Sequence, residues 1–222
     1  MPTAKTKALV FDVYGTLFDV HSVEEKCQEL FEGKGKEISK LWRQKQLEYA
    51  FLRQLMGQYA SFKTITTDSL RYALKTLNLS FQEVHMQQLL DAYEKLSYYP
   101  EVPEVLQQMK HKKLAVFSNG SRDMLEPLIH HSGLAPLFHE IISVDDIKQY
   151  KPSPASYNHV LNVLGVEREE VLFMSSNGWD ISGAKSFGFQ TAWINRSQSP
   201  VEELNQKPHH IYEDLNGIVE WR

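Results

Sequence analysis

The sequence predicts an α/β protein with a Rossmann-like parallel sheet core and a helical cap subdomain inserted after the first strand. Short, nearly continuous apolar runs occur within the first 20 residues and again after residue 100, where they alternate with stretches of helical spacing. Such runs are typical of strands buried on both faces of a parallel sheet. Residues 21–99 contain helical patterns and no convincing strand. We therefore expect one core of residues 1–20 and 100–222 and a cap of residues 21–99.

The first expected strand, residues 8–11, ends at Asp12, and the turn Gly15-Thr16 follows. In an open parallel sheet the carboxyl ends of the strands are where ligands bind. Glycine allows a tight turn, and a threonine hydroxyl can hydrogen-bond a neighbouring carboxylate. The alternative interpretation is an ordinary turn in which Asp12 caps its own loop.

Four helices are expected in the cap. Ser22 and Glu25 have the spacing of a capping box, which predicts a helix ending near residue 31. A longer helix is expected from residue 38 to 56, with apolar side chains on one face. Asp68 is predicted to cap a third helix that ends near residue 77, and a fourth is expected over residues 82–96.

Strands and helices then alternate. Strands are expected at residues 114–117, 141–143, 171–174 and 191–194. One helix is expected to begin near Pro103, and a second is expected to end near residue 131. Two more helices are expected over residues 156–164 and 180–187. Gly133, Gly165 and Gly188 each follow an expected helix as a stop signal.

Composition excludes several classes of protein. The chain has 222 residues, 42% of them hydrophobic, and a formal charge of -4, which favours neither nucleic acid nor an anionic membrane as a partner. No apolar run approaches the about 18–20 residues of a membrane span, and the polar start predicts no signal peptide. Cys27 is the single cysteine, so no internal disulfide is possible, and we expect a cytoplasmic protein. Its glutamate neighbours predict a raised thiol pKa and a poor nucleophile.

Polar residues follow three of the expected strands. Asp12 follows the first, Ser118 and Asn119 follow the strand at 114–117, and the segment 175–180 follows the strand at 171–174. Lys151 lies in a loop between the last two. We expect these side chains to meet in one crevice at the carboxyl edge of the sheet.

This order of motifs resembles the haloacid dehalogenase superfamily, whose cap is inserted at the same place. Most of its members are phosphatases, with a second aspartate two residues after the nucleophile and acidic metal ligands in the last motif. Here those positions hold Tyr14, Ser176 and Asn177. Mg²⁺ takes oxygen ligands that include carboxylates, so we expect no metal and no cofactor. The resemblance favours a leaving group that departs as a stable anion, such as halide.

Within the superfamily the chain resembles the metal-independent (S)-2-haloacid dehalogenases. The resemblance rests on segments 11–19, 41–49, 118–120, 150–152 and 175–180. It implies hydrolysis of small (S)-2-haloalkanoic acids to (R)-2-hydroxyalkanoic acids and halide, through an ester on Asp12 with inversion at the 2-carbon. It also implies a homodimer formed through cap helices, to which Tyr49, Phe51 and Leu52 would contribute.

The resemblance implies a role for each matching residue. Asp12 would attack the carbon, Arg43 and Asn119 would face the departing halide, and Ser118 would hold the substrate carboxylate. Lys151 would keep Asp12 ionised, and Asp180 would be the general base for ester hydrolysis. The residues expected to orient these groups are Thr16, Tyr157, Ser175 and Asn177. The residues expected to form the wall around the substrate are Tyr14, Gln44, Leu47, Phe62 and Trp179.

Two other functions are compatible with the residues: a Mg²⁺-dependent phosphatase of the same superfamily acting on a small phosphomonoester, and a non-enzymatic protein that binds a partner through the cap. Tyr14 and Asn177 count against the phosphatase, and the presence of both Asp12 and Lys151 counts against the binding protein. Single residues also have structural interpretations. Arg43 is compatible with a solvated helix face, and Trp179 and Tyr157 are compatible with simple packing.

Overall fold

A computed structural model describes residues 6–222; residues 1–5, part of the predicted core segment 1–20, lie outside the described residues. Six parallel strands form one sheet in the order β3-β2-β1-β4-β5-β6. Their bounds are Ala8–Phe11 for β1, Lys113–Ser118 for β2, Glu140–Ser143 for β3, Val171–Ser175 for β4, Gln190–Ile194 for β5 and His210–Tyr212 for β6. This is the doubly wound strand order, so the predicted fold class is confirmed.

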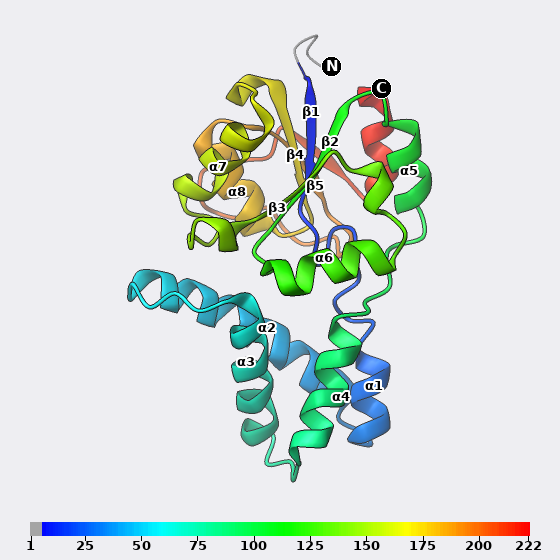
Figure 1. The fold of residues 1–222 in the computed structure, drawn as a ribbon, viewed down its shortest axis with the longest axis vertical. Helices are drawn as coiled ribbons and strands as arrows, with labels where there is room; N and C mark the ends of the chain where they lie inside the picture. Colours follow the sequence, from blue (N-terminus) through cyan, green and yellow to red (C-terminus); the bar gives the residue numbers. More distant parts are fainter. Residues whose placement is uncertain (1–5) are drawn as a thin grey trace.

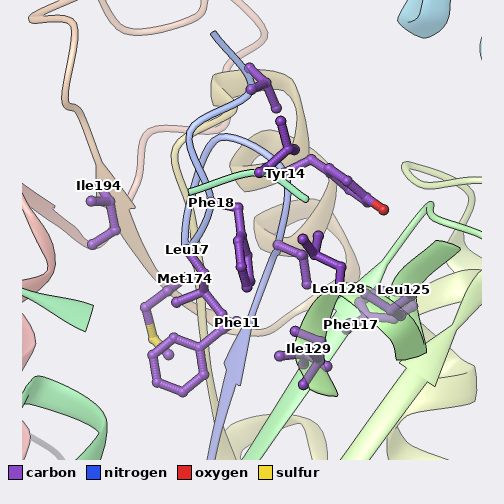
Figure 2. Packing of buried hydrophobic residues seen from close by; sticks show 14 of the residues in the cluster. Phe11, Tyr14, Leu17, Phe18, Phe117, Leu125, Leu128, Ile129, Met174 and Ile194 are labelled. Carbon is purple, nitrogen blue, oxygen red and sulfur yellow. The ribbon is translucent and has the colours of Figure 1, made fainter. Parts of the chain in front are cut away.

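Helices cover both faces of the sheet (Figure 1). On one side lie α7 (Pro154–Leu164) and α8 (Gly178–Phe187), and on the other lie α5 (Val102–Gln108) and the C-terminal 3-10 helix Leu215–Trp221. α6 (Arg122–His131) connects β2 to β3. Figure 2 shows how Leu125, Leu128 and Ile129 of α6 lie near the apolar side chains of β1 and β2. Strands β1, β2, β4 and β5 are almost entirely buried because helices enclose them, which explains their continuous apolar runs.

The register of the central strands places the predicted polar residues together. In β1, Phe11 lies opposite Val116 of β2 and Met174 of β4. The next residue, Asp12, donates its backbone N–H to the Met174 carbonyl at 2.8 Å. The ends of β2 and β4 therefore flank Asp12 at one edge of the sheet.

Four helices follow β1 and lie together beyond this edge (Figure 1). They are α1 (Glu24–Leu30), α2 (Gly35–Leu55), α3 (Phe62–Thr76) and α4 (Glu83–Tyr93). The two chain segments that connect them to the core run side by side, because the Asp19 amide donates to the Ser97 carbonyl at 2.8 Å and the Tyr99 amide to the Leu17 carbonyl at 3.0 Å. Over residues 6–222, none of the helices has the length and apolar character needed to cross a membrane.

Two predicted helix caps were wrong. Ser22 does not cap α1, because its hydroxyl donates to the Asp19 carbonyl at 2.8 Å and the N-cap position is Val23. α3 begins at Phe62 and is capped by Ser61, whose hydroxyl accepts from the Thr64 amide at 3.3 Å. Asp68 lies inside that helix, 3.0 Å from Arg53. The first turns of α3 are rich in threonine, a weak helix former, and this composition concealed the true start.

Two elements near the C-terminus were not predicted. β6 is a three-residue edge strand whose side chains are exposed or half-buried, so it has no apolar run. The 3-10 helix Leu215–Trp221 buries Leu215, Ile218 and Trp221, yet its tight geometry has no 3.6-residue period. Both elements belong to the C-terminal part of the core, which is farthest in sequence from Asp12.

Candidate active site

Two buried carboxylates share one buried ammonium group at the edge of the sheet. Lys151 Nζ donates to Asp12 Oδ1 at 2.8 Å and to Asp180 Oδ2 at 2.6 Å. The exposed fractions of these three residues are 5% for Asp12, 1% for Lys151 and 0% for Asp180. The three groups therefore form a cluster with two negative charges and one positive charge when all are ionised, shielded from water.

The surroundings of Lys151 favour its charged form. Its Nζ also donates to the Phe117 carbonyl at 3.2 Å and lies 5.0 Å and 5.4 Å from the ring centroids of Phe117 and Phe173. Burial alone lowers the pKa of Lys151, but the charges of Asp12 and Asp180 outweigh burial and raise it. Lys151 is therefore a fixed positive charge beside Asp12.

The second oxygen of Asp12 is held by neutral donors. Asp12 Oδ2 accepts from the Thr16 hydroxyl and from Asn177 Nδ2, each at 2.9 Å. The Thr16 hydroxyl in turn accepts from the Ser176 amide at 2.8 Å, and Ser175 Oγ accepts from the Asn177 amide at 3.1 Å. These bonds fix the orientation of the carboxylate, which is what a positioned nucleophile requires.

The surroundings of Asp180 raise the pKa of its carboxyl group. It lies in the first turn of α8, and its Oδ1 accepts from the Tyr157 hydroxyl at 2.8 Å. Burial, the largest cause, and the charge of Asp12 raise the pKa of Asp180, while Lys151 and the Tyr157 hydrogen bond oppose this, and the resulting pKa is about 6. A carboxylate that titrates near neutrality is suited to accept a proton from water.

Helix α2 and the residues after β1 supply the opposite wall. Arg43 of α2 donates from Nη2 to the Tyr14 carbonyl at 3.4 Å. The Tyr14 ring lies 5.9 Å from the rings of Phe62 and Tyr93. Burial raises the pKa of Tyr14 well above its usual value, and Arg43 opposes this. Tyr14 is thus a neutral phenol beside a cationic guanidinium.

A small cavity lies between helices α2 and α3 and the carboxyl ends of the strands. Its lining residues are Asp12, Tyr14, Arg43, Leu47, Phe62, Ser118, Asn119, Lys151, Asn177 and Trp179. Gln44, also predicted for the wall, is exposed on α2 and outside this set. The cavity volume is about 10 Å³, room for about one water molecule. A larger cavity of about 990 Å³ lies beside it, and Lys151 and Trp179 line both. A molecule larger than about one water does not fit into the small cavity in this structure.

Ser118 and Asn119 lie at the end of β2. Asn119 Oδ1 accepts from the Lys151 amide at 2.9 Å, so Asn119 also fixes the backbone that carries the lysine. Ser118 Oγ accepts from the Gly120 amide at 3.0 Å. A Cβ on Gly120 would lie 2.7 Å from the Tyr14 ring, so only glycine permits this close approach.

Some contributing residues were not predicted. Phe117 and Phe173 place their rings beside Lys151, and Tyr93 packs on Tyr14. Phe117 directly precedes Ser118, but a buried strand residue gives no sequence signal of such a contact. The pKa of Cys27 is raised, as predicted, to about 12, but the main cause is burial and not the predicted glutamate neighbours, of which Glu24 makes a smaller contribution.

The donor set at the carboxylates does not fit Mg²⁺. Lys151 Nζ stands between Asp12 and Asp180 and forms an ion pair with each carboxylate. Across residues 6–222 no three His, Cys, Asp or Glu side chains are grouped so that they could hold a metal ion. Magnesium requires several oxygen ligands with a favourable charge, and an ammonium group between the carboxylates opposes this.

Comparisons with known proteins point to one family. A family profile described as a haloacid dehalogenase-like hydrolase matches residues 6–188. The (S)-2-haloacid dehalogenase of Pseudomonas sp. (strain YL) is 45% identical over 216 residues, covering 96% of this chain and 93% of that protein. Haloacetate dehalogenase H-2 of Moraxella sp. (strain B) is 44% identical over 217 residues, 97% of each chain.

A solved structure is also closely similar. It is that of the L-2-haloacid dehalogenase from Xanthobacter autotrophicus with chloropropionic acid covalently bound. Its TM-score to this chain is 0.90, with 39% sequence identity and 97% of each chain covered.

Proposed function

The chain belongs to the haloacid dehalogenase-like hydrolases, and we propose that within this family it hydrolyses (S)-2-haloalkanoic acids to (R)-2-hydroxyalkanoic acids and halide. It is an enzyme, a hydrolase acting on carbon–halide bonds, and its substrate is a small 2-haloacid. The observation that carries the proposal is the Asp12 carboxylate, fixed by Lys151, Thr16 and Asn177 at a cavity that Arg43 also lines.

In the first step an oxygen of Asp12 attacks the 2-carbon from the side opposite the halogen. The new carbon–oxygen bond forms as the carbon–halogen bond breaks, and the halogen leaves with its electron pair. The configuration at the 2-carbon inverts, and an ester joins the substrate to Asp12. Lys151 supports this step because it holds one oxygen of Asp12 in place through its 2.8 Å hydrogen bond.

Arg43 and Asn119 would stabilise the departing halide. Both line the cavity, and the Arg43 guanidinium carries five N–H donors, of which one contacts the Tyr14 carbonyl at 3.4 Å. Negative charge grows on the halogen as the bond breaks, so a fixed cation in a dry cavity lowers the barrier. Ser118 would hold the substrate carboxylate, and Tyr14, Leu47, Phe62 and Trp179 would enclose its side group.

In the second step water attacks the carbonyl carbon of the Asp12 ester. Asp180 accepts a proton from that water, and the proton finally reaches the alkoxide oxygen of the departing hydroxy acid. The bond between the carbonyl carbon of Asp12 and that oxygen breaks, and the second proton of the attacking water is released to solvent. The carboxylate of Asp12 is thereby regenerated, and the inverted configuration at the 2-carbon is kept. Tyr157 orients Asp180 through its 2.8 Å hydrogen bond.

We further propose that residues 21–99 act as a cap that opens to admit the substrate, since the closed cavity is too small for it. Exposed apolar side chains at the end of α2, Leu52, Leu55 and Met56, support a homodimer formed through the cap. The single, buried Cys27 suits a reducing cytoplasm. Sedimentation of the wild type and of Leu55→Glu would test the dimer, which the variant should dissociate.

The test of the proposed function is halide release from each enantiomer of 2-chloropropionate, with EDTA present. We expect chloride from the (S) form only, with (R)-lactate as the product, and no effect of EDTA. Absence of chloride from both enantiomers, together with Mg²⁺-dependent hydrolysis of a phosphomonoester, would overturn the proposal.

A further inference from the structure

Arg196 lies just beyond β5, far along the chain from Asp12, and contacts the turn that carries the catalytic threonine. Its Nη2 donates to the Thr16 carbonyl at 2.9 Å and to Glu101 Oε1 at 2.6 Å. Its guanidinium carbon lies 3.6 Å from the centre of the Tyr99 ring. One side chain therefore joins the Asp12 turn to the second segment that connects the cap to the core.

This arginine is poorly placed for a role in solubility. Its side chain is 15% exposed, that of Glu101 is 14% exposed, and Arg196 Nε is buried with no hydrogen-bond partner in the part of the chain that the structure describes. Burying a guanidinium group with an unsatisfied donor opposes folding. The arrangement thus points to a positional role for the contacts that the arginine does make.

The Thr16 contact leads directly to the nucleophile. Thr16 is fully buried, and its hydroxyl donates to Asp12 Oδ2 at 2.9 Å, while its carbonyl accepts from Arg196. The direction of that hydroxyl depends on where the Thr16 backbone lies. Since Arg196 fixes the carbonyl of the same residue, it fixes the donor that orients the Asp12 carboxylate.

The Glu101 contact anchors Arg196 on the core. Glu101 stands at the N-terminus of α5, and its Oε1 also accepts from the Leu215 amide at 3.3 Å. Tyr99, on which the guanidinium stacks, donates its amide to the Leu17 carbonyl at 3.0 Å. Glu101 and Tyr99 therefore fix the position of the Arg196 guanidinium, which in turn contacts the turn at Thr16.

We propose that Arg196 is a positioning residue for Asp12, acting through Thr16. The inference rests on the proposed function, because it assigns Asp12 as the nucleophile. Loss of the contact lets the turn shift, and a misplacement of about 1 Å in a reacting group can lower the rate about 100-fold. Substrate binding is unaffected, because Arg196 does not line the cavity.

The experiment compares Arg196→Met with the control Arg168→Met. Arg168 makes the same two kinds of contact, to the Phe187 carbonyl at 3.4 Å and over the Phe187 ring at 4.4 Å, but away from Asp12. For Arg196→Met we expect kcat with (S)-2-chloropropionate to fall about 10- to 100-fold while KM stays within about twofold. The control should keep both constants, and Arg196→Lys should recover part of kcat.

A double-mutant cycle tests the route through Thr16. In a Thr16→Val background the hydroxyl is gone, so we expect Arg196→Met to lower kcat by less than about twofold further. The proposal would be overturned if the fold-losses of kcat in the two single variants multiplied in the double variant. It would also be overturned if Arg196→Met had the same kcat and KM as the Arg168→Met control. If Arg196→Met does not fold, Arg196→Lys serves in both comparisons.

Hydrogen exchange provides a readout that does not depend on the proposed function. Amides of residues 13–18 should exchange faster in Arg196→Met than in wild type, and amides of β3 should not change. Unchanged exchange in the 13–18 turn would refute the positioning role even if the protein proved inactive on haloacids. An inactive wild type with faster exchange in the variant would refute the proposed function alone.

Discussion

Replacing Asp180 by asparagine should separate the two chemical steps. The variant keeps the shape of the side chain but removes the base and one of the two carboxylates that face Lys151. Asp12 keeps its contacts with Lys151, Thr16 and Asn177, so ester formation should slow by less than about tenfold. General base catalysis contributes about 100- to 10,000-fold, so ester hydrolysis should slow by that much.

Rapid-quench measurement of chloride checks this expectation. With (S)-2-chloropropionate in excess, Asp180→Asn should release a burst of about one chloride per site and then turn over slowly. Asp91→Asn is a matched control, because Asp91 is exposed on α4 and accepts from Gln87 at 2.7 Å. It should show wild-type turnover. A slow release without a burst would refute the assignment of Asp180 to the second step.

The pH dependence of wild-type turnover follows from the same carboxylate. Burial raises the pKa of Asp180 to about 6, so the fraction that can accept a proton falls as pH drops below that value. If ester hydrolysis limits turnover, kcat should fall about tenfold for each pH unit below about 5, and the fall should disappear in Asp180→Asn. In a second prediction, Lys151→Met leaves the buried carboxylates of Asp12 and Asp180 facing each other without a positive charge. The free energy of unfolding should fall by about 3–5 kcal/mol at pH 7 and by less at pH 5. Urea unfolding at the two pH values would measure this. Arg43→Lys keeps the charge but loses the planar fork, so kcat should fall about 100-fold, with a larger loss for chloride than for iodide, as steady-state kinetics would report. Gly120→Ala should clash with the Tyr14 ring and lower stability by about 1–3 kcal/mol in the same unfolding assay; wild-type stability would contradict the close approach.

The sequence was informative where a pattern has one physical cause. Buried parallel strands leave apolar runs, and polar residues at their ends are brought together by the sheet, so the proximity of Asp12, Lys151 and Asp180 could be anticipated. The cap helices were recognised from their period, yet their caps were misassigned at Ser22 and Asp68. The Ser22 error arose because a short polar side chain can bond several backbone groups with similar energy, and tertiary packing decides between them. The Asp68 error arose because the threonine-rich first turns of α3 concealed where that helix begins.

Other features arise only in the folded chain. The pKa of Asp180 depends on burial as much as on its neighbours, and burial is set by packing that no local motif encodes. The Arg196 contact joins residues that are 180 positions apart in the sequence. β6 pairs with β5 through backbone groups, so its side chains reveal little of it. Such contacts need the three-dimensional structure.

The most direct test of the central claim is a single turnover in water enriched in oxygen-18, with enzyme in excess over (S)-2-chloropropionate. If an ester on Asp12 forms and water attacks its carbonyl carbon, the heavy oxygen should appear in the peptide that contains Asp12, and the lactate should carry an oxygen from the protein. Heavy oxygen found directly in the lactate, with Asp12 unlabelled, would show that water attacks the substrate itself and would contradict the account.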